Sequence, residues 1–144
     1  MKLKTSEARS RNMSAIKSKN TKPEIIIRKA LHAAGFRYRL HQKDLPGKPD
    51  LYLPKYKTVI FVHGCFWHQH EGCKDAVTPK TNTEFWKKKL NGNVYRDKEN
   101  IIELEKMGLK VIIVWECTIN ECSKNNEITK LVQQIQRILK NEDK

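Results

Sequence analysis

Residues 58–73 read TVIFVHGCFWHQHEGC, and this stretch decides how the rest of the chain is interpreted. Its first part, Thr58–His63, is apolar and β-branched, which is typical of a strand buried on both faces. Its second part has no hydrophobic period and is crowded with Cys and His instead. An irregular stretch inside a compact domain needs something to hold it, such as a metal. We therefore expect a central strand that leads directly into a metal-binding loop.

The loop and one later segment supply ligands that suit zinc. Five Cys and His residues lie close together in it, namely His63, Cys65, His68, His70 and Cys73. Thiolates and imidazoles bind zinc, which takes four such ligands in a closed tetrahedral site. The expected structural zinc ligands are Cys65, His70, Cys73 and Cys117. Cys122 is an alternative to Cys117, or an unligated thiol, and free thiols without any metal are the competing interpretation.

The flanking segments predict one mixed α/β domain. A helix is expected to begin at Thr21–Glu24, where Thr21 caps, Pro23 lies in the first turn and Glu24 completes a capping box, and to end near Gly35. The other expected elements are strands at 36–41, 50–53 and 110–115 and helices at 83–90, 94–107 and 128–139. Together with the strand at 58–63, this order favours a single central sheet with helices on both sides.

Charge separates the N-terminus from the rest of the chain. The 144 residues include 29 Lys and Arg against 16 Asp and Glu, a formal net charge of +13. Such a surface disfavours acidic small-molecule chemistry as the whole function and favours a polyanion partner. Glu7 is the only acid among residues 1–22. We expect residues 1–20 to be a basic arm that contacts DNA, although a solvated, frayed terminus has the same composition, and residues 21–144 to form the folded domain.

The sequence also bears on location. No apolar run approaches the ~18 residues of a membrane span, and the first residues lack the apolar region of a secretion signal. We therefore expect no membrane association and a cytoplasmic protein, in which thiolate ligands are favoured over disulfides.

A second group of residues suggests catalysis. Asp50 opens one strand, and an antiparallel pairing with Thr58–His63 would place it near Val62, His63 and His68. A carboxylate suits Mg²⁺, a hard cation that prefers oxygen ligands, and Glu24 could add a second one. Each acid alone is more often a cap or a turn residue. Acid, metal, histidine base and basic surface together make a nuclease a competitive interpretation.

Large aromatic residues raise a further question. Phe66 and Trp67 lie in the loop, and Phe85 and Trp86 precede three lysines on a predicted helix. They either pack beneath the loop or stack on nucleic-acid bases.

Several runs of residues, taken in order, resemble the very-short-patch repair (Vsr) endonucleases. The runs, spread over residues 8–118, are RNMSAI (11–16), VIFVHGCFWH (59–68), TEFW (83–86), NVYRD (93–97) and VWEC (114–117). The resemblance implies a central mixed sheet like that of type II restriction endonucleases, with an added structural zinc. It also implies recognition of a T·G mismatch, left by deamination of 5-methylcytosine, and nicking of one strand on the 5′ side of the mispaired T.

The resemblance also assigns roles to residues. Asp50 matches the Mg²⁺-binding aspartate, with the main-chain carbonyl of Val62 as a further ligand, and His68 matches the catalytic histidine. The residues that support this site or hydrogen-bond its water are Glu24, His63 and Asp97. The zinc ligands are again Cys65, His70, Cys73 and Cys117. The residues that match the wedge inserted into DNA are Phe66, Trp67 and Trp86, with Met13 entering from the other groove.

The chain departs from the related enzymes at two points. Glu71-Gly72 adds one residue between the expected zinc ligands His70 and Cys73. The central strand also lacks the Glu-x-Lys of ordinary restriction-type nucleases, so activation of the water is expected from His68 and the metal.

Two alternative functions are a non-catalytic, zinc-stabilised DNA-binding module and a restriction-type endonuclease that cuts paired DNA. The resemblance further suggests mismatch-repair factors and a cytosine methyltransferase as functional partners, and an asymmetric nick suggests a monomer.

Overall fold

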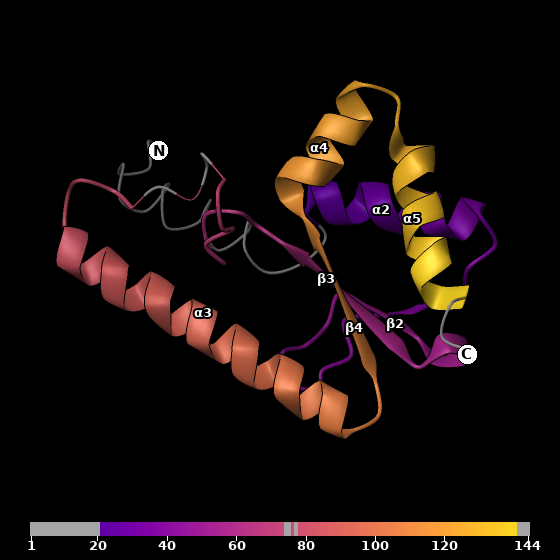
Figure 1. Ribbon diagram of the computed structural model, residues 1–144, viewed down its shortest axis with the longest axis horizontal. Coiled ribbons are helices and arrows are strands. Elements are labelled where there is room, and N and C mark those ends of the chain that lie inside the picture. Colours follow the sequence, from indigo (N-terminus) through magenta and orange to yellow (C-terminus); the bar gives the residue numbers. More distant parts are fainter. Residues whose placement is uncertain (1–20, 74–75, 77, 141–144) are drawn as a thin grey trace, which may run out of the picture.

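The computed structural model describes residues 21–73, 76 and 78–140, so the expected basic arm at 1–20, including Met13, lies outside the described residues. The elements follow the chain in the order α2 (Lys22–Ala33), β1 (Arg39–Leu40), β2 (Leu51–Leu53), the 3-10 helix η1 (Pro54–Tyr56), β3 (Thr58–His63), α3 (Thr83–Lys106), β4 (Lys110–Trp115), α4 (Glu116–Lys124) and α5 (Ile128–Lys140) (Figure 1). No helix in these ranges is both long and apolar enough to cross a bilayer.

The four strands form one mixed sheet in the order β1-β2-β3-β4. The pairs β1–β2 and β2–β3 are antiparallel, whereas β3 and β4 are parallel, with His63 opposite Trp115 at their carboxyl ends. A parallel pair needs a long crossover, and α3 provides it. This confirms the prediction of a single α/β domain with a central mixed sheet.

Helices cover both faces of the sheet (Figure 1). On one face, α2, α4 and α5 pack with the strands around a cluster that includes Ile27, Ile60, Ile119 and Ile135. On the other face, Leu104 of α3 packs against strand residues of a smaller cluster. Because neighbouring residues of β3 point to opposite faces, Phe61 and His63 share the α3 face.

Helix α2 begins as its sequence predicts. The Thr21 hydroxyl accepts a hydrogen bond from the Glu24 N–H at 3.4 Å, and a proline lies in the first turn. The helix ends before Gly35, whose φ of +98° is the left-handed conformation that glycine adopts without strain. The start of α2 is therefore fixed, and with it the position of Glu24.

Three elements differ from the prediction. The strand expected at 36–41 pairs only at Arg39–Leu40, since the three-residue β2 offers few partners. The two helices expected at 83–90 and 94–107 are one helix, α3, because Gly92 costs only about 1 kcal/mol and a long helix absorbs this. Helix α4 had no prediction, and it starts at Glu116, directly after the last residue of β4.

Candidate active site and metal centre

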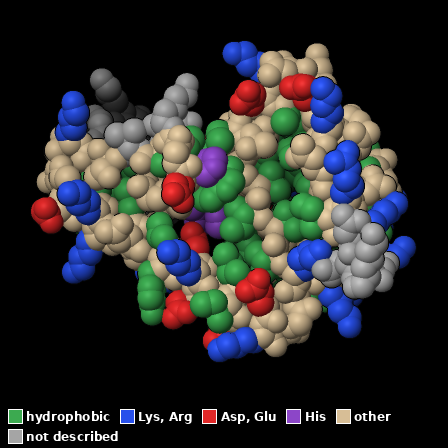
Figure 2. Space-filling view, in the orientation of Figure 1, with side chains coloured by type: hydrophobic (Ala, Val, Ile, Leu, Met, Phe, Trp, Pro, Cys, Tyr) green, Lys and Arg blue, Asp and Glu red, His purple; other side chains and the backbone are tan. Residues whose placement is uncertain are grey.

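The residues expected to form the active site line one cavity of about 390 Å³ at the carboxyl ends of β3 and β4. Figure 2 shows histidine side chains in a hollow between the α3 side of the molecule and the rest. The expected residues that line this cavity are Glu24, Asp50, Val62, His63, His68 and Asp97. Asp50 and His68, which lie 18 positions apart in the sequence, therefore face the same space.

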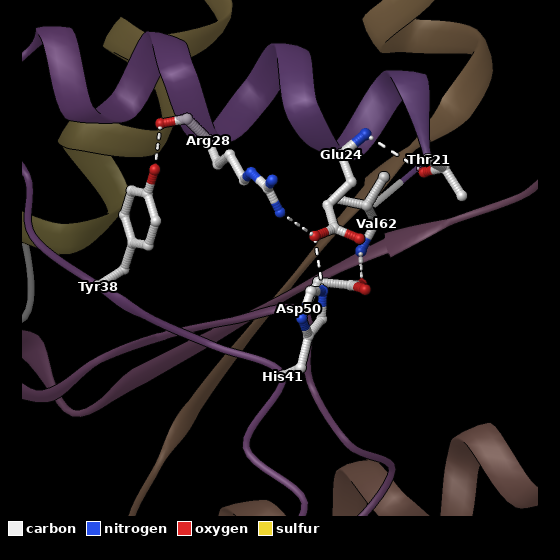
Figure 3. A network of polar contacts seen from close by, with 7 residues as sticks. All are labelled: Thr21, Glu24, Arg28, Tyr38, His41, Asp50 and Val62. Atoms are coloured by element: carbon white, nitrogen blue, oxygen red, sulfur yellow. Dashed lines mark hydrogen bonds and ion pairs between the residues drawn. The ribbon is translucent and has the colours of Figure 1, made fainter. Parts of the chain in front are cut away.

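Glu24 is the centre of a buried polar network (Figure 3). Its side chain is 1% exposed, and its Oε2 atom accepts a hydrogen bond from Arg28 at 2.9 Å and lies 2.7 Å from Nε2 of His41. A buried carboxylate needs such partners, because removing it from water is costly otherwise. The network holds the Glu24 carboxylate beside Asp50.

Asp50 lies just before β2 and faces β3. Its Oδ2 atom accepts a hydrogen bond from the main-chain N–H of Val62 at 2.6 Å, as the antiparallel register predicts. Burial, followed by the nearby Glu24 carboxylate, raises the pKa of Asp50 to about 7. Two carboxylates held this close repel each other unless a proton or a cation lies between them.

This donor set fits a divalent cation. One ligand atom each from Glu24, His41 and Asp50 lies within 4.8 Å of the others. The two carboxylates offer the oxygen donors that Mg²⁺ prefers, and Val62, whose main-chain N–H reaches Asp50, lines the same cavity. The residues that would hold the ion are Asp50 and, through its carbonyl, Val62, with Glu24 alongside.

Three other side chains that line the cavity form a second polar group. The Nδ1 atom of His68 lies 2.6 Å from Oδ2 of Asp97, a residue of α3. The ring of His68 stacks on that of His63, with centroids 3.8 Å apart and planes 5° from parallel. Burial lowers the pKa of His63 to about 4, which leaves this ring neutral at physiological pH. Among the described residues, its buried Nδ1 atom has no hydrogen-bond partner.

The expected zinc ligands also come together. One donor atom each from Cys65, His70, Cys73 and Cys117 lies within 4.8 Å of the others. The Nδ1 atom of His70 is 3.6 Å from the sulfur of Cys65 and 3.4 Å from that of Cys117. A tetrahedral zinc with bonds of about 2.3 Å to sulfur and 2.0–2.1 Å to nitrogen places these atoms about 3.5 Å apart. The donor set and its spacing therefore fit zinc, and Cys122 lies outside this group.

Burial makes the thiolate form of Cys65 dependent on a bound metal. Cys65 is fully buried, and burial together with the neighbouring thiols of Cys117 and Cys73 raises its pKa to about 12. A buried thiolate beside other thiolates is stable only with a cation between them.

A single backbone conformation separates the two groups of histidines. Gln69 has a φ of +49°, in the left-handed region that few non-glycine residues adopt. Its side chain donates a hydrogen bond to the carbonyl of Phe66 at 2.6 Å. This turn directs His68 toward Asp97 and His70 toward the cysteines, so two histidines one residue apart serve different sites.

The aromatic residues of the loop and of α3 form one cluster. The ring of Phe66 lies 5.0 Å from Trp67 and 5.6 Å from Trp86, and the two indole rings are 6.0 Å apart. Asn93 of α3 donates a hydrogen bond to the main-chain carbonyl of Trp67 at 3.0 Å, which ties the loop to the helix. Both Phe66 and Trp67 line the cavity, so the aromatic cluster borders the candidate active site.

The cavity contains residues that sequence reasoning missed. Lys48 is the only lysine or arginine among the described residues that line it, and Glu116, the first residue of α4, lines it as well. His41 was missed because the strand before it is too short to show where its side chain points. Arg28 could have been found, because it follows Glu24 at the i,i+4 spacing of an ion pair.

Comparisons with known proteins identify the family of this chain. The family profile described as DNA mismatch endonuclease Vsr matches residues 1–74. A type II nicking enzyme of Neisseria meningitidis serogroup A, V.NmeAIP, is 49% identical over 132 residues, which are 91% of this chain and 94% of that protein. V.XorIIP, a type II nicking enzyme of Xanthomonas oryzae pv. oryzae, is 44% identical over 76% of this chain and 79% of that protein. The DNA mismatch endonuclease Vsr of Escherichia coli K12 is 43% identical over 77% of this chain and 70% of its own length. The chain therefore belongs to the Vsr family of DNA mismatch endonucleases.

Proposed function

We propose that this endonuclease nicks one strand of duplex DNA on the 5′ side of the T in a T·G mismatch, of the kind left by deamination of 5-methylcytosine, in a Mg²⁺-dependent reaction. The observation that carries the proposal is the single cavity that Asp50 and Glu24 line together with His68 and Asp97. The mismatch in the name of the E. coli relative supports the choice of substrate.

Each of these residues has its own role in the proposed reaction. Asp50 and the carbonyl of Val62 would hold Mg²⁺, which when bound neutralises phosphate charge and acidifies water. Asp97 holds Nδ1 of His68, which leaves Nε2 to accept the proton of the attacking water. An imidazole suits this task near neutral pH. His63 stacks on that ring and fixes its plane.

The zinc ligands have a structural role in this proposal. Cys65, His70, Cys73 and Cys117 would hold Zn²⁺, which closes the loop against the start of α4. The loop forms no helix or strand in its described part and contributes little core of its own, so the metal replaces hydrophobic packing there.

The aromatic cluster accounts for mismatch selection. Phe66, Trp67 and Trp86 would wedge between base pairs, with Met13 of the N-terminal arm entering from the opposite groove. Unstacking costs least where pairing is already poor, so a wedge favours a T·G pair over a Watson–Crick pair. The basic arm at 1–20 would add affinity that does not depend on sequence.

A nicking assay tests the proposal. Two duplexes of one sequence, with T·G or with C·G at the central position, are incubated with Mg²⁺ or with chelator. We expect one nick, in the T strand of the mismatched duplex, only with Mg²⁺ and lost in Asp50→Asn. The exposed Asp44 lies in the turn before Asp50, and Asp44→Asn is the matched control that keeps activity. Equal nicking of both duplexes would instead indicate a restriction-type enzyme, and full activity of Asp50→Asn would exclude this metal site.

We further propose that the enzyme acts as a monomer, since nicking one strand of an asymmetric mismatch needs only one active site. Light scattering of the protein with and without the mismatched duplex measures its oligomeric state directly.

Mismatch-repair factors and a cytosine methyltransferase are the proposed functional partners, because the methyltransferase creates the base whose deamination produces the mismatch.

A further inference from the structure

We propose that Trp115 is a positioning residue for nicking, because its ring joins the Cys/His cluster to the pair of histidines in the cavity. The proposal rests on the function proposed above and adds a residue to which neither the family resemblance nor the comparisons assign a role.

The rings form a continuous series from one site to the other. His70, whose Nδ1 faces two cysteine sulfurs, stacks on Trp115 with centroids 4.1 Å apart and planes 8° from parallel. Trp115 contacts His63 in a T-shaped arrangement at 5.2 Å. His63 then stacks on His68 at 3.8 Å. The T-shaped contact lies within the range of about 4.5–7 Å that is typical of aromatic pairs, and the two parallel stacks are closer, with their rings in van der Waals contact.

The fold explains why Trp115 can reach both sites. In the parallel register, Trp115 is the partner of His63, so both lie at the carboxyl ends of adjacent strands. Trp115 is also the last residue of β4, and the zinc ligand Cys117 follows two positions later in α4. One side chain at this junction therefore packs against a ligand of each centre.

The histidine pair needs this support because few polar contacts fix it. Among the described residues, the buried Nδ1 of His63 has no hydrogen-bond partner, so the neighbouring rings orient that imidazole. Those rings are Phe61 at 5.4 Å, His68 and Trp115. His68 in turn has its Asp97 contact and the stack on His63. A tilt of His63 would move the proton acceptor, and misplacement by about 1 Å costs on the order of 100-fold in rate.

Three full-length variants test the proposal. Trp115→Leu removes the ring, Trp115→Phe keeps a smaller one, and Ile113→Ala is the matched control. Ile113 lies two residues earlier on the same face of β4 and packs in the α3-side cluster, so its truncation weakens the same layer without touching a histidine contact. Single-turnover nicking of the T·G duplex, DNA affinity, bound zinc and imidazole NMR signals are measured for each.

The expected result separates positioning from general stability. Trp115→Leu nicks at least about 10-fold more slowly with unchanged DNA affinity, Trp115→Phe lies between it and the wild type, and Ile113→Ala nicks at the wild-type rate. The imidazole signal of His68, which stacks on His63 and so reports a movement of that ring, shifts in the Trp115 variants, whereas that of His32 in α2 does not. If Trp115→Leu fails to fold, the same criteria apply to Trp115→Phe.

Three outcomes would overturn the proposal: wild-type nicking by the Trp115 variants, an equal rate loss in Ile113→Ala, or an unshifted signal of His68. A wild-type protein that leaves the T·G duplex intact would overturn the proposed function instead. In that case the imidazole signals alone decide whether Trp115 orients the histidine pair.

Discussion

The Nδ1 atom of His68 lies 2.6 Å from Oδ2 of Asp97, so a contact in the lining of the cavity joins α3 to the loop that follows β3. The pair resembles the arrangement in which a carboxylate sets the tautomer of a catalytic imidazole, with Nδ1 protonated and Nε2 free to accept a proton.

Replacing Asp97 should therefore slow catalysis more than binding. In Asp97→Asn, an amide can donate to Nδ1 and stabilise the wrong tautomer, and we expect the nicking rate to fall by about 100-fold or more. DNA affinity should stay within a factor of about two. The matched control is Glu99→Gln on the same helix, an exposed residue that accepts a hydrogen bond from Tyr95. Wild-type nicking by Asp97→Asn would show that His68 needs no partner.

The left-handed backbone at Gln69 leads to a second prediction. Gln69→Gly should keep both zinc and nicking activity, because glycine adopts a φ of +49° without strain. Gln69→Val should lose both, since a β-branched residue is strongly disfavoured there. Zinc content by mass spectrometry and single-turnover nicking measure the two effects. A Gln69→Val protein with full zinc and full activity would show that the left-handed conformation at Gln69 is not needed to direct His68 and His70 to different sites.

The two cysteines near the C-terminal end of the sheet should behave differently. Cys117→Ser should lose zinc and about 3 kcal/mol or more of stability, which corresponds to roughly 6–12 °C in Tm for a chain of this size. Cys122→Ser is the matched control and should keep zinc, because Cys122 lies outside the ligand group. Metal analysis and thermal unfolding compare the two variants. Equal zinc loss in both would place Cys122 among the ligands.

The aromatic cluster should determine discrimination rather than chemistry. In Trp67→Ala we expect the ratio of nicking rates on T·G and paired duplexes to fall about 10-fold or more, because stacking on a base contributes about 1–3 kcal/mol. Zinc content should not change. Tyr95→Ala on α3, a residue that is 65% exposed, controls for the loss of an exposed aromatic ring outside the cluster. An unchanged ratio in Trp67→Ala would exclude the wedge.

The N-terminal arm should contribute salt-dependent affinity. Residues 1–20 carry six lysines and arginines, and replacing all six with glutamine should weaken DNA binding at low salt. The slope of log affinity against log salt should fall by about 5 at most, if each contacts one phosphate. Lys124→Gln in α4 is the control for a single lost surface charge. An unchanged slope would show that the arm does not contact the phosphate backbone of the DNA.

The parts of the structure that sequence could predict are those that local pattern determines. The apolar run of β3, the cap of α2 and the cluster of Cys and His around residue 70 each follow from residue type and spacing. The antiparallel register predicts that Asp50 lies beside Val62, and the hydrogen bond that the Val62 N–H donates to the Asp50 carboxylate confirms it. Known strand geometry was enough to bring distant residues into one site.

The parts that sequence could not predict depend on tertiary contacts. His41 pairs with Glu24 across 17 positions, through a strand of only two residues that shows no usable period. Trp115 looked like an ordinary strand residue, and its stacking partner is 45 positions away. Gly92 suggested a helix boundary, but packing of α3 along the sheet overrides a weak local preference.

The buried ion pairs of Glu24 have a consequence for anyone who tries to inactivate this enzyme. Oε2 of Glu24 contacts both Arg28, in the same helix, and His41, which follows β1, so the His41 contact anchors α2 to the segment between β1 and β2. Truncating Glu24 to alanine would remove the carboxylate that Arg28 and His41 contact. A loss of activity in Glu24→Ala would therefore not distinguish unfolding of the protein from loss of a group in the active site. The isosteric substitution Glu24→Gln is the change that keeps the fold while it removes the carboxylate charge.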